Sequence, residues 1–258
     1  MRAGRIETQV ESGIGWLIFD NVRRRNAMSV AMWRGAAEAI AAFERDERVR
    51  VIVMRGAGEE AFVSGADISE FEKVRGDAQA AQEYEAISGE AFAALENVSK
   101  PLIAMIRGFC FGGGVAVAMK ADIRIAEAGS LFAIPAARLG IAYPPASVRD
   151  LVSLVGPAHA KDILFSARRL DSAEAAVIGL VNRVSAPGAL EKDVRDLAAT
   201  LVDNAPLAIR AAKAFVDQYA RGAPDRTAEL VALCFDSADY AEGRRAFMEK
   251  RRPAFRGC

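Results

Sequence analysis

The sequence has few of the side chains on which many catalytic sites are built. His159 is the only histidine among 258 residues, and it falls in a helical stretch far in sequence from any candidate nucleophile. A Ser-His-Asp triad, a Cys-His pair and a histidine-ligated zinc site therefore have little support. The three cysteines (Cys110, Cys234 and Cys258) are too widely spaced for a metal site or a disulfide framework. We expect no metal site, and we expect Cys110 to be a small buried residue and not a reactive thiol.

Long apolar runs and net charge are also missing. No stretch approaches the roughly 20 apolar residues of a membrane span, and Met1–Val10 lacks the apolar core of a signal peptide. We therefore expect a cytoplasmic protein that does not enter the membrane. The 34 basic and 34 acidic residues balance, which makes a nucleic-acid partner unlikely.

The chain is organised around the glycine-interrupted stretch Pro101–Lys120. Branched apolar residues at Leu102–Ile106 predict a buried strand, and Val115–Met119 predicts a short buried helix after the triplet Gly112–Gly114. The first N–H groups of a helix have no partner within it, and glycine lets a ligand approach them, so an anion is expected here. The residues after the triplet fit neither a P-loop nor a dinucleotide fingerprint. Alternatively, the glycines only allow the helix to pack closely on a sheet.

A second glycine turn lies at Ala61–Phe71, where Gly65 permits an unusual backbone angle. The rest of the pattern predicts an α/β protein. It begins with a hairpin, continues with a helix capped by Ser29, and has its last strand at Val181–Val184. Helices follow, so we expect a core over residues 1–190 and a helical oligomerisation region over residues 191–258.

With both glycine turns in view, the sequence resembles the crotonase, or enoyl-CoA hydratase/isomerase, superfamily. The matching motifs run in family order from about Asn26 to the C-terminus. They are Asn26-Ala27-Met28-Ser29, Ser64-Gly65-Ala66-Asp67-Ile68, Gly108-Phe109 with Gly112-Gly113-Gly114, Ala121-Asp122-Ile123, Phe132 with Pro135, Leu139-Gly140-Ile141, Ala173-Glu174-Ala175, Gly179-Leu180-Val181, Ala205-Pro206-Leu207 and Glu242–Arg251.

The resemblance implies a spiral of strand–strand–helix repeats with a helical C-terminal part, assembled as a homotrimer or a dimer of trimers. It implies an acyl-CoA substrate and no cofactor beyond the coenzyme A of that substrate. By motif position, the thioester oxygen would lie between the main-chain N–H groups of Ala66 and Gly113. The residues themselves agree with this role, because both lie in glycine turns that can bind a developing oxyanion.

Positions that would bind the rest of the substrate follow from the same resemblance. Arg23, Arg24 and Arg25 fall where the family's first loop passes the nucleotide, and guanidinium groups suit phosphate. Phe247 and Lys250 match C-terminal positions that reach the coenzyme A of the same or a neighbouring subunit. Alternatives are a solvated surface for the arginines, helix packing for Phe247 and helix capping for Asp67. The remaining positions assigned to substrate binding are Ala27, Ser64, Asp67, Ile68 and Gly112.

The chain departs from the hydratases at the two glutamates that they use to move protons. Ala116 and Ala136 stand at those positions, and alanine cannot transfer a proton. We therefore predict that the protein is not an efficient conventional enoyl-CoA hydratase. Tyr143 resembles a tyrosine of bacterial methylmalonyl-CoA decarboxylases, although those enzymes have a histidine where this chain has Ala66. Packing in a proline-rich turn is the alternative role for Tyr143.

Three functions remain open at this point. The first is an acyl-CoA lyase or isomerase of fatty-acid-type chemistry that works through a stabilised enolate. The second is a decarboxylase of a malonyl-type thioester, with Tyr143 in the site and Arg138 or Arg149 holding the charged acyl group. The third is a non-catalytic relative that binds coenzyme A or RNA, which the neutral charge disfavours in the case of RNA.

Overall fold

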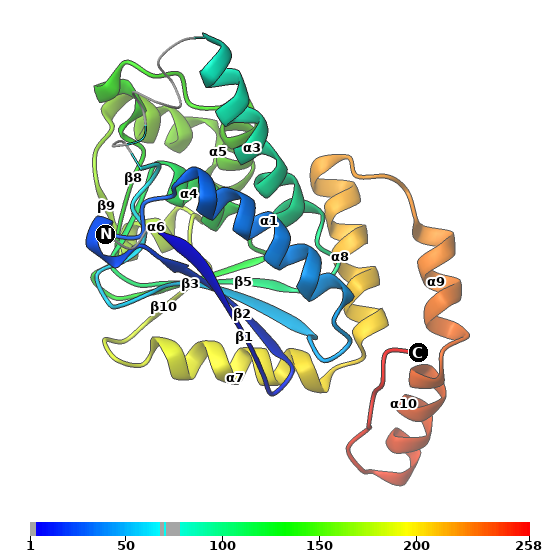
Figure 1. The fold of residues 1–258 in the computed structure, drawn as a ribbon. Coiled ribbons are helices and arrows are strands. Elements are labelled where there is room, and N and C mark those ends of the chain that lie inside the picture. Colours follow the sequence, from blue (N-terminus) through cyan, green and yellow to red (C-terminus); the bar gives the residue numbers. More distant parts are fainter. Residues whose placement is uncertain (1–3, 68–69, 71–77) are drawn as a thin grey trace.

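The protein is built on two sheets flanked by helices (Figure 1). The computed structural model describes residues 4–67, 70 and 78–258. The six-stranded sheet contains, in spatial order, β1 (Arg5–Glu11), β2 (Ile14–Asp20), β3 (Val51–Gly56), β5 (Leu102–Ile106), β7 (Ile123–Glu127) and β10 (Arg183–Ser185). The four-stranded sheet contains β4 (Ala61–Val63), β6 (Phe109–Phe111), β8 (Leu131–Ala133) and β9 (Leu170–Asp171).

Helices follow the strands and dominate the C-terminal part of the chain. They are α1 (Val30–Arg45), α3 (Ala78–Asn97), α4 (Gly113–Met119), α5 (Pro145–Ser166), α6 (Ser172–Val177), α7 (Leu190–Asp203), α8 (Pro206–Arg221), α9 (Thr227–Phe235) and α10 (Ala238–Glu249), with 3-10 helices η1 (Val22–Arg24) and η3 (Pro135–Leu139).

The chain winds as a spiral in which each turn gives one strand to each sheet. β3 and β4 precede α3, β5 and β6 precede α4, and β7 and β8 precede α5. Within the large sheet β3, β5 and β7 are parallel neighbours, and within the small sheet β4, β6 and β8 are parallel neighbours. This confirms the α/β fold of strand–strand–helix repeats with a helical C-terminal region.

The N-terminal elements also form as predicted. β1 and β2 pair as an antiparallel hairpin around Ser12 and Gly13, both of which have positive φ. The Ser29 side chain accepts a hydrogen bond from the Met32 N–H, which caps the start of α1. The predicted helix boundary therefore agrees with the observed one.

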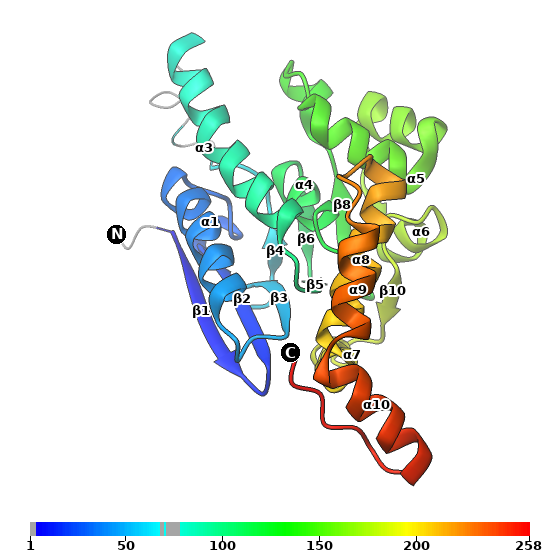
Figure 2. The same cartoon turned by 90° about the vertical axis from the view of Figure 1, so that its right-hand side faces the viewer.

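The central strands β2, β3 and β5 of the large sheet are buried on both faces, which explains their uninterrupted apolar residues. Side chains on one face, such as Leu17 and Met54, belong to the main core with α1 and α3. Those on the other face, such as Trp16 and Val53, pack against Leu190, Val194 and Ala198 of α7. Figure 2 shows α1 and α7 on opposite sides of the strands. A strand with two buried faces needs apolar residues at successive positions.

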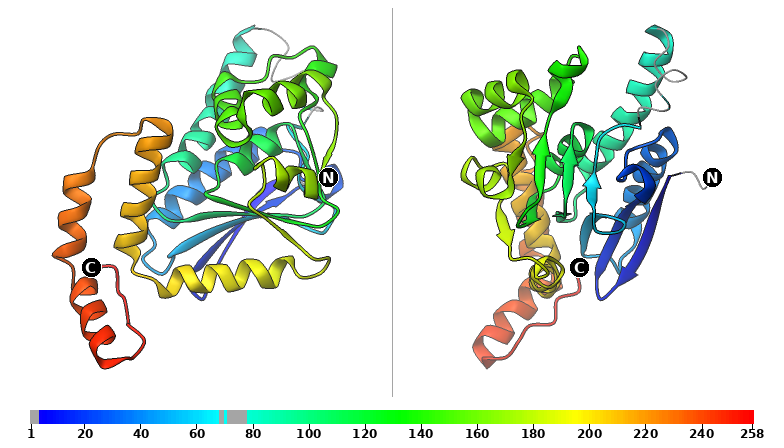
Figure 3. Two further views of the ribbon diagram at one scale, coloured as in Figure 1. Left: turned by 180° about the vertical axis from the view of Figure 1, so that it is seen from behind. Right: turned by 90° about the vertical axis from the view of Figure 1, so that its left-hand side faces the viewer.

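The C-terminal helices leave a large apolar surface uncovered. α9 and α10 project away from the two sheets, as the views in Figure 3 show. Tyr219 on α8 is 85% exposed, and Phe247 and Met248 on α10 are 83% and 80% exposed. The boundary at residues 190 and 191 stays a prediction. Among the described residues, no helix is long and apolar enough to cross a bilayer.

The structure adds short strands that the sequence analysis does not predict. β4 and β6 lie within or next to the two glycine turns and contain three residues each. Strands this short carry too few positions for an alternating pattern to be recognised. They matter because they place both turns at the same edge of the small sheet.

Candidate active site

Glycine stands at the three consecutive positions Gly112, Gly113 and Gly114 for different structural reasons. Gly112 has φ of 51°, a conformation that residues with a side chain rarely adopt. A Cβ on Gly114 would lie 1.9 Å from the Val63 carbonyl oxygen, so only glycine lets α4 approach β4 this closely. The packing role considered for the glycines is therefore present at Gly114. It does not account for Gly113.

Gly113 lies next to the other glycine turn. A Cβ placed on Gly113 would be 3.7 Å from the Ala66 nitrogen, and one placed on Gly65 would be 3.9 Å from the Gly113 nitrogen. Both Ala66 and Gly113 are only half-buried. Within residues 4–67, 70 and 78–258, neither main-chain N–H donates a hydrogen bond. Two unpaired amides from distant segments thus lie side by side where a ligand can reach them.

Both amides line a cavity of about 220 Å³. Its wall is mostly apolar and is formed by segments of α1, α3, α4, η3 and α5 and by the two glycine turns. The lining residues are Trp33, Ser64, Gly65, Ala66, Tyr84, Glu85, Ser88, Phe92, Gly112, Gly113, Ala116, Ile134, Pro135, Ala136, Leu139, Ile141, Ala142, Tyr143, Pro144 and Ser147.

Few groups in this wall can transfer a proton. Ala116 and Ala136 both line the cavity, so the two positions at which hydratases are expected to have glutamate face the same space as the amides. Glu85 is the one carboxylate among the described lining residues, and these residues include no lysine, arginine, histidine or cysteine. The described part of the chain also holds no cluster of three or more potential metal ligands.

Tyr143 contacts the glycine triplet Gly112–Gly114 directly. Its hydroxyl donates a hydrogen bond of 3.0 Å to the Gly112 carbonyl oxygen. Burial is the main reason why the pKa of this phenol is raised far above its usual value, with the nearby Cys110 and Asp150 adding to the shift. Tyr143 is therefore a neutral donor at physiological pH and is held on the turn.

The basic loop with Arg23, Arg24 and Arg25 lies against the glycine turn at Ser64 and Gly65. The Ser64 N–H and hydroxyl donate to the carbonyl oxygens of Arg25 and Arg24. The Arg24 side chain pairs with the nearly buried Asp67 at 2.5 Å, and Arg25 pairs with Glu60 at 2.6 Å. These arginines therefore already pair with carboxylates. The Arg25 guanidinium carbon also lies 4.7 Å from the centroid of the Phe109 ring.

The other predicted residues of this loop and turn have different surroundings. Arg23 is exposed on η1. Ala27 is buried, and its carbonyl oxygen accepts a hydrogen bond from the Asn21 side chain. Ile68 lies outside the described residues.

Phe247 and Lys250 lie far from the cavity within one copy of the chain. Both belong to the end of α10, which Figures 1 and 2 show well away from α4. Phe247 lines a different cavity of about 440 Å³ between α8, α9 and α10, which shares no lining residue with the first. Within one copy of the chain, neither residue lines the cavity that holds the two amides.

Sequence analysis does not identify the aromatic end of the cavity. Trp33 of α1 donates a hydrogen bond of 2.9 Å from Nε1 to the Tyr84 hydroxyl on α3. The Trp33 and Phe92 rings lie with their centroids 5.1 Å apart. Glu85 and Ser88 are on the same side of α3 and are missed as well. The amphipathic pattern of α3 was the available signal, but it does not say which partner its face meets.

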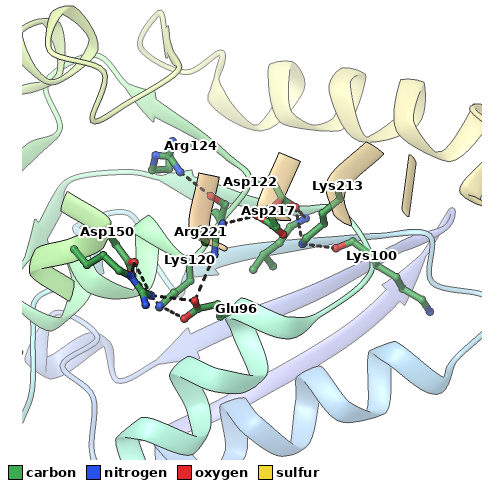
Figure 4. A network of polar contacts seen from close by, with 12 residues as sticks. Glu96, Lys100, Lys120, Asp122, Arg124, Asp150, Lys213, Asp217 and Arg221 are labelled. Carbon is green, nitrogen blue, oxygen red and sulfur yellow. Dashed lines mark hydrogen bonds and ion pairs between the residues drawn. The ribbon is translucent and has the colours of Figure 1, made fainter. Parts of the chain in front are cut away.

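A network of ion pairs holds the far end of α4. Lys120, which follows α4, is 3% exposed and pairs with Glu96 and with Asp150, the latter at 2.8 Å. Figure 4 shows Lys120 between these carboxylates and Lys213 beside Asp122, where the α8 segment meets the core. Arg149 pairs with Asp150 and Glu96 and does not line the cavity, and neither does Arg138.

Comparison with known proteins decides the family. The family model described as enoyl-CoA hydratase/isomerase matches residues 9–258. The chain belongs to this family. A crotonyl-CoA hydratase from Syntrophomonas wolfei is 33% identical over 249 residues, covering 95% of each chain. A carnitinyl-CoA dehydratase from Citrobacter koseri is 33% identical, covering 91% of this chain and 92% of the relative.

Solved structures of this family share the fold. A crystal structure described as an enoyl-CoA hydratase/carnithine racemase from Magnetospirillum magneticum superimposes with a TM-score of 0.93 and 35% identity, covering 98% of this chain and 96% of the other. The crotonase superfamily predicted from the motifs is therefore confirmed.

Proposed function

We propose that this family member acts on an acyl-CoA thioester by stabilising an enolate, and that it is not an efficient hydratase. The observation that carries the proposal is the pair of unpaired amides, Ala66 and Gly113, side by side in one cavity. A thioester oxygen seated between them gains negative charge when the α-carbon loses a proton. Each donor of this kind typically stabilises the transition state by about 3–4 kcal/mol.

Water addition needs further groups that this cavity does not supply. One group must activate water and another must protonate the α-carbon. Ala116 and Ala136 line the cavity in place of the expected glutamates. Hydration of crotonyl-CoA is therefore expected to proceed far below ordinary enzyme rates. The decrease in absorbance of the conjugated thioester measures it. Rapid, saturable hydration would contradict this part of the proposal.

The amides themselves can be tested at Gly113. Proline is tolerated at the first position of a helix, where its missing N–H has no helical partner. Gly113→Pro therefore removes the donor while keeping the start of α4. Gly113→Ala keeps the donor, and its Cβ would meet the Ala66 nitrogen at an ordinary 3.7 Å. We expect turnover of a thioester to be abolished in the first variant and retained in the second.

A decarboxylase remains the alternative, but two observations rank it lower. A malonyl-type substrate carries a carboxylate, and the described lining residues include no cationic side chain that could orient it. The Tyr143 hydroxyl is engaged with the Gly112 carbonyl oxygen. Release of carbon dioxide from methylmalonyl-CoA that is lost in Tyr143→Phe would reverse this ranking. Salt-dependent RNA affinity without thioester turnover would instead favour the non-catalytic alternative.

Substrate binding and assembly complete the proposal. The loop with Arg23, Arg24 and Arg25 would bind the phosphates of coenzyme A, and no other cofactor is required. The exposed apolar side chains of α8–α10 support association of copies into a homotrimer or a dimer of trimers, in which Phe247 and Lys250 reach a neighbouring cavity. Light scattering after size-exclusion chromatography tests this, and a monodisperse monomer would contradict it.

A further inference from the structure

Enolate formation requires a base close to the α-carbon, and the cavity offers few. We propose that Glu85 of α3 is the carboxylate that removes and returns this proton. The inference rests on the proposed acyl-CoA chemistry and adds the group that the two alanines do not provide. The assignment of Glu85 depends on α3 forming part of the cavity wall, and no motif in the sequence indicates it.

The position of Glu85 on its helix carries the first part of the argument. Tyr84, Glu85, Ser88 and Phe92 all line the cavity. Their spacing corresponds to one side of an α-helix, on which residues three and four apart are neighbours. Glu85 is exposed, so it lies at the open end of the cavity and not beneath its floor.

Glu85 also differs from the other charged residues around the site because its carboxylate is available. No hydrogen bond or ion pair engages its side chain within the described part of the chain. By contrast, Asp67 is paired with Arg24. A carboxylate without a cationic partner keeps its capacity to accept a proton from a ligand.

The remaining polar groups of the wall are poor bases. The Tyr143 hydroxyl donates to the Gly112 carbonyl oxygen, and the Tyr84 hydroxyl accepts from Trp33 Nε1. The Ser64 and Ser88 hydroxyls donate to main-chain carbonyl oxygens. A hydroxyl needs an adjacent base before it can remove a proton. Among the described lining residues, Glu85 is left as the group with the right chemistry.

The proposed step is a balanced proton transfer. A Glu85 carboxylate oxygen takes the α-proton, the C–H bond breaks, and its electron pair forms the enolate with charge on the thioester oxygen. The Ala66 and Gly113 N–H groups stabilise that charge. Return of the proton to the α-carbon completes an exchange, and its return to another carbon of an unsaturated chain completes an isomerisation. No oxidant, metal or second substrate is needed.

The experiment measures exchange of the α-protons of butyryl-CoA in deuterated water by NMR. Wild-type protein is compared with Glu85→Gln, Glu85→Asp and the matched control Glu90→Gln. Glu90 lies on the same helix, is exposed and does not line the cavity. We expect Glu85→Gln to lose roughly 100-fold or more in exchange rate, as is typical when a general base is removed. Glu85→Asp keeps part of the rate, and Glu90→Gln keeps all of it.

Calorimetric titration with butyryl-CoA separates this inference from the proposed function. Wild-type exchange that is unchanged in Glu85→Gln overturns the role of Glu85 and leaves the amide site intact. Wild-type binding without exchange overturns the role of Glu85 and enolate formation from this substrate, and leaves only acyl-CoA binding. Absence of both binding and exchange in the wild type overturns the acyl-CoA function and the Glu85 inference together. Loss of exchange in Glu85→Gln with unchanged binding supports both.

Discussion

The Tyr143 hydroxyl and the Gly113 N–H are related through a single peptide unit. Tyr143 donates to the Gly112 carbonyl oxygen, and that carbonyl belongs to the same planar group as the Gly113 N–H. In a trans peptide the two point in opposite directions. Fixing the carbonyl therefore fixes the direction of the N–H. Tyr143 is in this way a positioning residue for the proposed oxyanion site.

Removing the Tyr143 hydroxyl should weaken turnover without abolishing it. A typical hydrogen bond contributes about 1 kcal/mol net, so Tyr143→Phe is expected to lower kcat by up to about tenfold. KM should change little. Because burial raises the pKa of Tyr143, the phenol stays protonated over about pH 6–9, and the shapes of the wild-type and variant pH profiles should agree. A rate limb present only in the wild type would contradict the positioning role.

Restoring both carboxylates should create hydratase activity. Ala116 and Ala136 face the same cavity as the amides, so the double variant Ala116→Glu/Ala136→Glu supplies a base for water and an acid for the α-carbon. The added volume is expected to cost about 1–3 kcal/mol of stability. Crotonyl-CoA hydration is the measurement. The matched double glutamine variant has nearly the same shape and should remain inactive. Equal hydration rates in the two double variants would refute the explanation that missing carboxylates prevent hydration.

Gly114 should be far less tolerant of substitution than other glycines in helices. Its Cβ would meet the Val63 carbonyl oxygen at 1.9 Å, so Gly114→Ala forces α4 away from β4. We expect a loss of about 1–3 kcal/mol or more in the free energy of unfolding, measured by chemical denaturation. A Cβ added to Gly89 in α3 would have no neighbouring atom within 4 Å. Gly89→Ala should therefore stabilise the protein by about 0.5–1 kcal/mol.

Lys120 should contribute to stability because its pair with Asp150 is buried. Lys120 is 3% and Asp150 is 9% exposed, and the two lie 2.8 Å apart. Lys120→Met removes the buried cation from Asp150, which keeps its pairing with Arg149, so the expected cost is about 1–3 kcal/mol. The double variant Lys120→Met/Asp150→Asn also removes the buried carboxylate charge and should cost less than the sum of the single changes. Additive costs in a double-mutant cycle would show that the pair is not coupled.

Cys110 and Cys258 should differ in their reaction with a thiol reagent. Burial raises the pKa of the Cys110 thiol well above its usual range, so it stays neutral and protected in the folded protein. Native protein should therefore expose Cys258 to a thiol reagent and withhold Cys110 until it unfolds. Since the folded pKa is the higher one, this contribution to stability is present below the thiol's ordinary pKa and is lost as pH rises above it. Rapid labelling of Cys110 in native protein would contradict its burial.

The local signals in the sequence predict much of the fold and one part of the site. The Ser29 cap, the apolar strands and the glycine turns depend on nearby residues, and these features agree with the structure. Glu85 and Trp33 could not be assigned to the cavity, because the direction of a helix face is set by packing between distant segments. The same limit applies to Phe247, whose distance from the cavity depends on where α10 projects.

The contact between Gly114 and Val63 has a consequence for how this site can change. It joins two main chains, so the close approach of α4 to β4 is made by backbone atoms. Residues such as Ala116, Ala136 and Glu85 can then be exchanged while the amides stay at a constant spacing. New proton-transfer chemistry can be acquired by substitution around a fixed backbone, without rebuilding the fold.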